Sequence, residues 1–380
     1  MLVYAFGCLL SSVLFYLSSN VKYGKKQFVN IILLIISMCI PCVIAGCRDL
    51  SIGTDVKIYA NDMFISALHT DSIFNYMKMS YKSVEPLFKM LVYILSLTKS
   101  RFIYYFGLEL ACVFPIFIRV YKFKFRYSWI SIYLYFVWLF GFSLNIMRQS
   151  IAIAILFWGC KYVYERNIKK FFIVVIFSMG FHLTGAVGII IYFIYAMFSY
   201  DTNKFKNGQF NRFVKKYNKI LKPILLIILI LIVANSSILI TNISILFNRY
   251  HAEVYDMSET NDVGLGYGII IAVALAIAYY VTYVTKQHNE QKNKGTLFII
   301  ICGIILFYMS KISGQLYRIS LFFTSYNLIY FSLSFEKIKQ KSICKLLMVL
   351  IVLVFICFIY HFYIKIGWNS VYPYKVYLNK

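Results

Sequence analysis

The stretch Leu346–Tyr360, with the sequence LLMVLIVLVFICFIY, contains no charged residue. A second run, Ile224–Ala234 (ILLIILILIVA), has the same character, and similar runs recur along the whole chain. A helix that crosses a bilayer needs about 20 predominantly apolar residues, and such runs form its centre. We therefore expect an all-α, polytopic integral membrane protein.

The composition of the 380 residues supports this expectation, because 61% are hydrophobic and only 14% are charged. A soluble domain usually carries about 25% charged residues, so this chain lacks the polar surface to fold in water. The net charge of +25 would suggest nucleic acid in a soluble protein, but membrane proteins collect Lys and Arg in their cytoplasmic loops. The composition excludes a soluble fold and disorder, and we expect no nucleic-acid partner.

The apolar segments predict about 10–13 transmembrane helices. The candidates are residues 2–19, 28–46, 102–118, 127–145, 148–164, 171–181, 183–198, 221–241, 267–284, 296–310, 316–333 and 344–363. Two of them, 171–181 and 183–198, are short and meet at His182, so they form either a tight hairpin or a broken helix. We expect residues 1–380 to form a single transmembrane domain.

The positions of the charged residues predict the orientation of the chain. If the N-terminus lies outside, the inside loops are 20–27, 119–126, 161–170, 201–222, 285–294 and 336–345. These loops contain most of the 39 basic residues and few of the 14 acidic residues. Because cytoplasmic loops are enriched in Lys and Arg, the sequence predicts an N-terminus on the outside.

Two outside segments are long enough to contain structure of their own. The first, 47–101, has an amphipathic middle and an apolar stretch, Leu87–Leu97. That stretch is too short to cross the bilayer comfortably, so we expect an interfacial or re-entrant helix over residues 85–98. The second segment, 242–266, is acidic and forms an outer loop.

Strongly polar residues gather at the membrane edges that this orientation places outside. They are Arg48, Asp49, Asp55, Glu85, Asn145, Arg148, Gln149, His182, Arg249, His251, Gln315, Tyr317 and Arg318. Charged residues at membrane depth are costly and usually face a cavity or a partner. The sequence therefore predicts a polar site on the outer face.

Arginine suits a phosphate ligand because its planar guanidinium makes two parallel hydrogen bonds. Arg148 and Arg318 lie at the ends of predicted helices, and Arg48 and Arg249 lie in the outside segments. Each of them could bind a phosphate. An arginine at a helix end also reaches lipid headgroups, and Arg48 could simply pair with a neighbouring aspartate.

Three residues are candidates for proton transfer. His182 can exchange a proton near neutral pH, although a lone histidine among apolar residues is more often structural. Asp55 could act as a base or cap a following helix. Glu85 precedes Pro86, which also fits a carboxylate at a helix N-terminus.

The nine cysteines lie mostly in apolar runs, where a cysteine behaves as a small buried hydrophobe. The chain has no metal-ligand spacing, no Walker motif, no Gly-x-Ser-x-Gly and no His-Glu-x-x-His. We therefore expect no metal, no cofactor and no ATP-driven pump.

Several of these stretches, taken together and in order, resemble the EpsG family of bacterial exopolysaccharide proteins, which includes Wzy-type polysaccharide polymerases. The matching pieces are Arg48-Asp49, Gly53-Thr54-Asp55 with Tyr59, Glu85-Pro86, Met147-Arg148-Gln149 with Ile151-Ala152, Phe181-His182, Tyr317-Arg318-Ile319 and Tyr372-Pro373-Tyr374. The likeness extends from about residue 40 to residue 375, and residues 200–300 add little to it.

The resemblance implies a metal-independent membrane glycosyltransferase of the bacterial inner (cytoplasmic) membrane. It would polymerise undecaprenyl-pyrophosphate-linked oligosaccharide repeat units at the outer face, for exopolysaccharide, capsule or O-antigen. Arg148 and Arg318, then Arg48 and Arg249, would bind the diphosphate.

The resemblance extends to further roles and partners. Asp49, Gln149 and Tyr317 would complete the substrate site, and the base would be His182, Asp55 or Glu85. The partners would be the lipid-linked oligosaccharide, the bilayer, a chain-length regulator and a flippase.

Three other functions fit the same composition. A flippase would carry the lipid-linked sugar across the membrane, but it would need polar residues on both sides. A glycan ligase or another outer-face transferase differs from a polymerase only in its acceptor, and composition does not separate them. A scaffold without catalytic activity is the third alternative.

Overall fold

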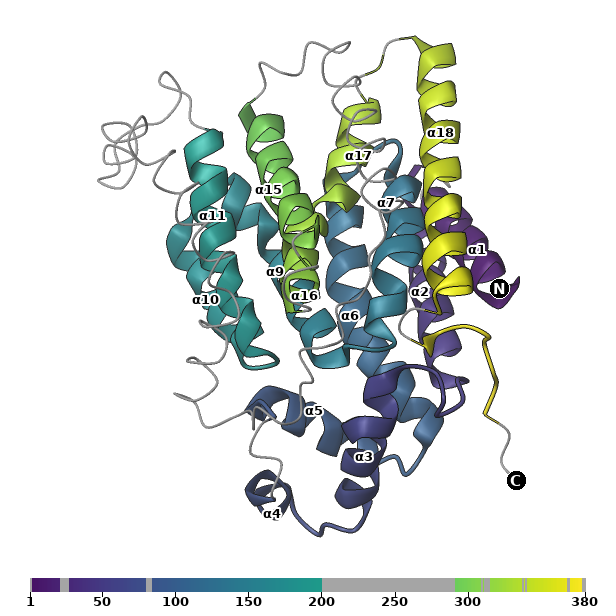
Figure 1. The fold of residues 1–380 in the computed structure, drawn as a ribbon, viewed down its shortest axis with the longest axis vertical. Helices are drawn as coiled ribbons and strands as arrows, with labels where there is room; N and C mark the ends of the chain where they lie inside the picture. Colours follow the sequence, from purple (N-terminus) through teal and green to yellow (C-terminus); the bar gives the residue numbers. More distant parts are fainter. Residues whose placement is uncertain are drawn as a thin grey trace.

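The computed structural model describes residues 2–20, 27–79, 84–199, 291–308, 310, 315–336, 338, 340–367 and 370–377. Long helices lie side by side in one bundle, and a group of short helices lies at one end of it (Figure 1). The bundle contains α1 (Leu2–Asn20), α2 (Gln27–Gly46), α6 (Arg101–Phe123), α7 (Ser128–Leu134), η2 (Tyr135–Leu139), α8 (Phe140–Ser143), α9 (Met147–Tyr164), α10 (Ile168–Met179), η3 (Leu183–Ala186), α11 (Val187–Phe198), α15 (Gln291–Tyr308), α16 (Gln315–Thr324), α17 (Asn327–Glu336), α18 (Lys341–Ile359) and η7 (Tyr360–Lys365). The end group contains η1 (Val56–Ala60), α3 (Asn61–Leu68), α4 (Ile73–Lys78) and α5 (Pro86–Ser96).

The prediction of an all-helical membrane protein is confirmed. In the described part of the chain, four helices are long and apolar enough to cross a membrane: Leu2–Ser19, Phe28–Gly46, Arg101–Phe123 and Lys341–Lys365. Shorter apolar helices are Pro86–Ser96, Ser128–Ser143, Leu183–Phe198 and Lys294–Phe307. The expected spans 221–241 and 267–284 and the expected loop 242–266 lie outside the described residues. The total number of spans and the side of the N-terminus stay predictions.

Burial separates the helices of the bundle into outer and central ones. α1, α2 and α18 expose many large apolar side chains, as expected for surfaces that face lipid. In contrast, α9 is buried on nearly all sides because α6 and α10 pack against it. The first turn of this central helix contains Arg148 and Gln149.

One predicted span, 316–333, is divided in the structure into α16 and α17. The prediction of a single helix there is therefore wrong. The break falls at Ser325 and Tyr326. At the end of α16 and in the break itself, the hydroxyls of Thr324 and Ser325 donate to the carbonyls of Ser320 (3.0 Å) and Phe322 (2.8 Å). Hydroxyl side chains that bind nearby carbonyls compete with the helical ladder, and a hydropathy pattern does not register this competition.

The predicted segments 171–181 and 183–198 form a helical hairpin of α10 and α11 (Figure 1). His182 lies in the turn, and its backbone N–H donates to the carbonyl of Ser178 (3.1 Å). The turn packs tightly, since a Cβ on Gly185 would lie 2.4 Å from the Ser178 hydroxyl oxygen. The Leu87 N–H of α5 donates to the carbonyl of Gly180 (3.0 Å), so the turn that contains His182 lies beside α5.

The segment 47–101 covers one end of the bundle with η1, α3, α4 and α5 (Figure 1). The expected helix over residues 85–98 corresponds to α5, and its placement relative to the membrane stays a prediction. The C-terminal residues lie against the start of the segment. Arg48 and Val376 form an isolated antiparallel bridge, and the Asp49 N–H donates to the carbonyl of Lys375 (2.8 Å).

Candidate functional site

The site begins where the loop after α2 meets the turn before α9. Gly53 has φ +87°, and a Cβ there would lie 2.3 Å from the Leu144 carbonyl oxygen, so only glycine fits without strain. The Asn145 side-chain oxygen then accepts hydrogen bonds from the Thr54 hydroxyl (2.7 Å) and the Asp55 N–H (3.1 Å). These contacts hold Asp55 beside the first turn of α9.

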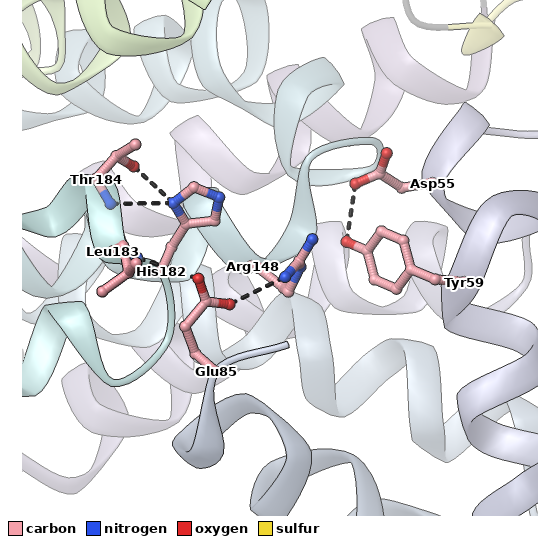
Figure 2. Close-up of polar contacts among 7 residues, drawn as sticks. All are labelled: Asp55, Tyr59, Glu85, Arg148, His182, Leu183 and Thr184. Atoms are coloured by element: carbon pink, nitrogen blue, oxygen red, sulfur yellow. Dashed lines mark hydrogen bonds and ion pairs between the residues drawn. The ribbon is translucent and has the colours of Figure 1, made fainter. Parts of the chain in front are cut away.

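Asp55 is linked to Arg148 through Tyr59, which lies one helical turn further along the chain. The Tyr59 hydroxyl donates to Oδ2 of Asp55 (2.8 Å), and the Arg148 guanidinium carbon lies 4.8 Å from the centre of the Tyr59 ring (Figure 2). Burial raises the pKa of the Asp55 carboxyl, and the nearby positive charge of Arg318 opposes this rise. Asp55 therefore binds its proton more tightly than an exposed aspartate, although cations are close.

Arg148 also contacts Glu85 on its other side. Nη1 of Arg148 lies 3.0 Å from Oε2 of Glu85, and the Leu183 N–H donates to Oε1 (3.2 Å). Glu85 is 3% exposed, whereas the Arg148 side chain is 14% exposed. Pro86 begins α5 directly after Glu85, but the carboxylate does not cap its own helix. It joins α5 to α9 and η3 instead.

His182 is oriented by its own turn. Its Nδ1 lies 2.7 Å from the Thr184 hydroxyl oxygen and 3.3 Å from the Thr184 backbone nitrogen (Figure 2). A backbone N–H can only donate, so Nδ1 is an acceptor and the neutral ring carries its proton on Nε2. His182 therefore presents an N–H group rather than a lone pair at Nε2.

The N-terminal turn of α16 provides the second arginine. The Arg318 Nε donates to the Tyr317 hydroxyl (3.1 Å), and the Gln149 side-chain amide donates to the Arg318 carbonyl (2.8 Å). Gln149 and Tyr317 are buried, and Arg318 is partly exposed. Gln149 thus fastens α9 to α16, and the positive charge of Arg318 acts on the carboxyl group of Asp55.

Arg48 differs from the other two arginines because it is only 2% exposed. Its Nη1 donates to the Leu144 carbonyl (2.7 Å), its Nη2 lies 3.3 Å from the Met147 sulfur, and its guanidinium carbon lies 4.6 Å from the centre of the Tyr105 ring. These contacts use Arg48 as an internal clamp between the loop after α2 and the turn before α9.

Asp49 makes a contact within its own loop, where its Oδ1 accepts the Ser51 N–H (2.9 Å). The hydrogen bonds from Ser51 lower the pKa of Asp49. The remaining predicted ligand, Arg249, lies outside the described residues, as does His251.

The structure therefore joins Glu85 to Arg148, and Gln149 and Tyr317 to Arg318, by direct contacts. Asp55 reaches Arg148 through Tyr59, and His182 lies in the turn whose Leu183 N–H binds Glu85. The residue whose role the sequence did not indicate is Tyr59, which joins Asp55 to Arg148. The signal was present, because residues four apart on a helix face each other and Tyr59 follows Asp55 by this spacing. Among the described residues, no three His, Cys, Asp or Glu side chains are placed to hold a metal ion.

The cluster combines two partly exposed arginines, two carboxylates and an imidazole at the end of an apolar bundle. Such a group can bind an anion, stabilise a developing negative charge and transfer a proton.

The comparison with protein families identifies the family of this chain. The model of the EpsG family matches residues 31–376, nearly the whole chain. In searches with this chain, no curated protein and no solved structure matches. The chain therefore belongs to the EpsG family and is a membrane protein related to exopolysaccharide production.

Proposed function

We propose that this protein is a glycosyltransferase that polymerises undecaprenyl-pyrophosphate-linked oligosaccharide repeat units at the outer face of the bacterial inner membrane. The observation that supports this most directly is the position of Arg148 and Arg318. Both are partly exposed and both are at the end of an apolar helical bundle, where Arg148 pairs with Glu85 and the charge of Arg318 acts on Asp55. Guanidinium groups at the edge of an apolar bundle suit a substrate that joins a diphosphate to a lipid.

The distribution of charge supports an outward-facing site. The basic stretches 119–126, 161–170 and 336–345 follow the ends of α6, α9 and α17, which lie away from α3–α5 (Figure 1). If that end is cytoplasmic by the positive-inside rule, the cluster is at the outer face and the N-terminus lies outside. The expected total of about 10–13 spans belongs to the same proposal.

The proposed reaction moves the growing chain from its lipid to a new lipid-linked unit. The bond between the anomeric carbon and the diphosphate oxygen breaks, and an acceptor hydroxyl forms the new glycosidic bond. Negative charge develops on the departing diphosphate, and the guanidinium groups of Arg148 and Arg318 stabilise it. The Nε2–H of His182 can donate a further hydrogen bond to a phosphate oxygen.

The acceptor hydroxyl must lose its proton, and the geometry favours Asp55 as the base. Both oxygens of Glu85 are already engaged by Arg148 and the Leu183 N–H. The neutral ring of His182 presents a donor. Asp55 uses only Oδ2 in its contact with Tyr59, so Oδ1 can accept the hydroxyl proton. A chain-length regulator and a flippase are further partners in this proposal.

The first experiment is to delete the gene and profile lipid-linked glycans and surface polymer by gel electrophoresis and mass spectrometry. We expect single repeat units to accumulate at the outer face and the long ladder to disappear. Units confined to the cytoplasmic face would instead identify a flippase, and full-length polymer still attached to its lipid would identify a ligase. An unchanged glycan profile would leave a scaffold without catalytic activity.

A further inference from the structure

Glu109 is a buried carboxyl in α6, one of the helices long and apolar enough to cross the membrane. It is 3% exposed, and it takes no part in the reaction proposed above. An acidic residue inside a membrane span is costly and needs a partner or a function. The hydrogen bonds of Glu109 show which helix it fixes to α6.

Oε1 of Glu109 accepts hydrogen bonds from the hydroxyls of Ser143 (2.9 Å) and Tyr135. Both donors belong to the continuous stretch of α7, η2 and α8, which packs against α6. The single Ser143 proton is shared, because the carbonyl of Phe140 also lies 2.8 Å from this hydroxyl. Glu109 therefore anchors the last residue of α8 to the neighbouring helix.

Ser143 is the residue immediately before the turn on which the site is built. The next residue, Leu144, accepts the hydrogen bond of Arg48 and faces Gly53. Asn145 then binds Thr54 and the backbone of Asp55. A shift of Ser143 would consequently displace the contacts that place Asp55, and with them the start of α9.

α6 holds this turn at two levels. Tyr105 and Glu109 are four residues apart, so their side chains lie on one face of the helix. Arg48 stacks over Tyr105 and bonds the Leu144 carbonyl, while Glu109 bonds Ser143 one residue earlier. The turn is thus fixed to α6 through two adjacent residues.

We propose that Glu109 is a positioning residue that acts through Ser143 to hold Asp55 and Arg148 at their working separation. This inference rests on the proposed function for its effect on catalysis, but its structural part does not. The competing interpretation is a carboxylate that carries protons or ions within the membrane. The two differ in whether the negative charge itself is needed.

The test compares Glu109→Gln with Glu109→Ala. The amide oxygen of glutamine can still accept the hydroxyl bonds of Tyr135 and Ser143, but it cannot ionise. We expect Glu109→Ala to lower polymer synthesis roughly 10- to 100-fold, the range for small displacements of reacting groups, and Glu109→Gln to restore most of it. If glutamine is as inactive as alanine at equal membrane levels, the charge is essential and the positioning role is wrong. Glu165→Ala, at an exposed position in the ion pair with Lys161, is the matched control.

A second readout does not depend on polymer synthesis. In a cysteine-free background used for this readout only and not for activity, Thr54→Cys and Asn145→Cys replace two residues in direct contact, and the rate of disulfide formation reports the alignment of the two segments. Glu109→Ala should slow this rate at least severalfold, and Glu109→Gln should not. An unchanged rate in Glu109→Ala would overturn the inference even if polymer were lost.

If Glu109→Ala does not accumulate, Ser143→Ala replaces it, because this change removes one hydroxyl and little volume. A slower cross-link in Ser143→Ala supports the anchoring contact, and an unchanged rate contradicts it. If the cross-linking rate responds as expected but the wild-type protein makes no polymer, the proposed function fails and the positioning role of Glu109 survives.

Discussion

Arg48 and Arg148 are both arginines at the edge of the bundle, within the same end of the molecule, yet the structure uses them differently. Arg48 is 2% exposed and donates to a backbone carbonyl and stacks on a tyrosine. Arg148 keeps 14% of its side chain exposed and pairs with a buried carboxylate. Arg48 therefore holds two segments together inside the protein, whereas part of the Arg148 side chain stays accessible, as its proposed contact with substrate requires.

Exposure, not residue type, distinguishes the two arginines and is the basis of the different roles proposed for them. Arg148 is preorganised, because Glu85 and the Tyr59 ring hold it from two sides. A guanidinium fixed in this way loses little conformational entropy when it binds an anion. Both Nη atoms of Arg48 already have partners inside the protein.

The largest expected effect is that of Arg148→Ala. Loss of one preorganised donor to the developing charge costs roughly 100- to 1,000-fold in rate, so polymer should be nearly absent on a gel of surface glycans. The same change leaves Glu85 buried without its cation, which costs about 3–5 kcal/mol. The double variant Arg148→Ala/Glu85→Gln removes the unpaired buried charge and with it this cost in stability. If the double variant, inserted at the normal level, makes wild-type polymer, Arg148 has no role in catalysis.

Arg48→Met should produce the opposite pattern. It leaves the Leu144 carbonyl without its buried donor, at about 1–3 kcal/mol, and it removes the stacking on Tyr105, worth about 2 kcal/mol. We expect a lower melting temperature in detergent and less protein in the membrane, with activity per molecule reduced about 10-fold, less than for Arg148→Ala, because Arg48 helps to hold the same turn as Glu109. A stable Arg48→Met protein without activity would mean that Arg48 binds substrate after all, and the contrast with Arg148 would fail.

The third prediction concerns pH. Burial raises the pKa of Asp55 above its ordinary value, and Asp55 must be ionised to act as a base. Polymer synthesis should therefore decline as the outside pH falls through this raised pKa, approaching tenfold per pH unit below it. Asp55→Asn should have a low, pH-independent rate in spheroplasts supplied with labelled precursor. A normal acid limb in Asp55→Asn would assign it to another group.

Much of the architecture follows from local sequence, and the roles within the site do not. Runs such as Leu346–Tyr360 predict membrane helices by length and hydropathy, and the structure contains α18 there. Hydropathy does not indicate which side-chain hydroxyls compete with the backbone hydrogen bonds of a helix. The break between α16 and α17 was therefore not expected. The different roles of Arg48 and Arg148 depend on burial and on contacts between residues about 60–100 positions apart.

The same limit applies to the choice among the candidate bases. Sequence provides His182, Asp55 and Glu85 without a ranking, because each residue type can accept a proton. The ranking comes from contacts: both oxygens of Glu85 are engaged, and the ring of His182 is oriented by Thr184. Such information is three-dimensional, since the partners come from α9, η3 and the hairpin turn.

The smallest expected effect, that of Tyr59→Phe, sharpens the comparison. Phenylalanine keeps the ring beside Arg148 but removes the hydroxyl that donates to Asp55. A hydrogen bond from a neutral hydroxyl to a charged carboxylate contributes about 1.5–3 kcal/mol at most. At this partly exposed site, water replaces part of that contribution. We expect a loss of severalfold in polymer synthesis and normal insertion.

The direction of the pH shift makes this variant informative. The hydrogen bond from Tyr59 lowers the pKa of Asp55, because it stabilises the ionised form. Without it, the acid limb of the pH profile should move to higher pH, while Tyr104→Phe, a buried tyrosine that bonds the Ala60 carbonyl instead, should leave the limb in place. A shift in both variants, or in neither, would mean that Tyr59 contributes packing alone and that the proton of the acceptor does not pass to Asp55.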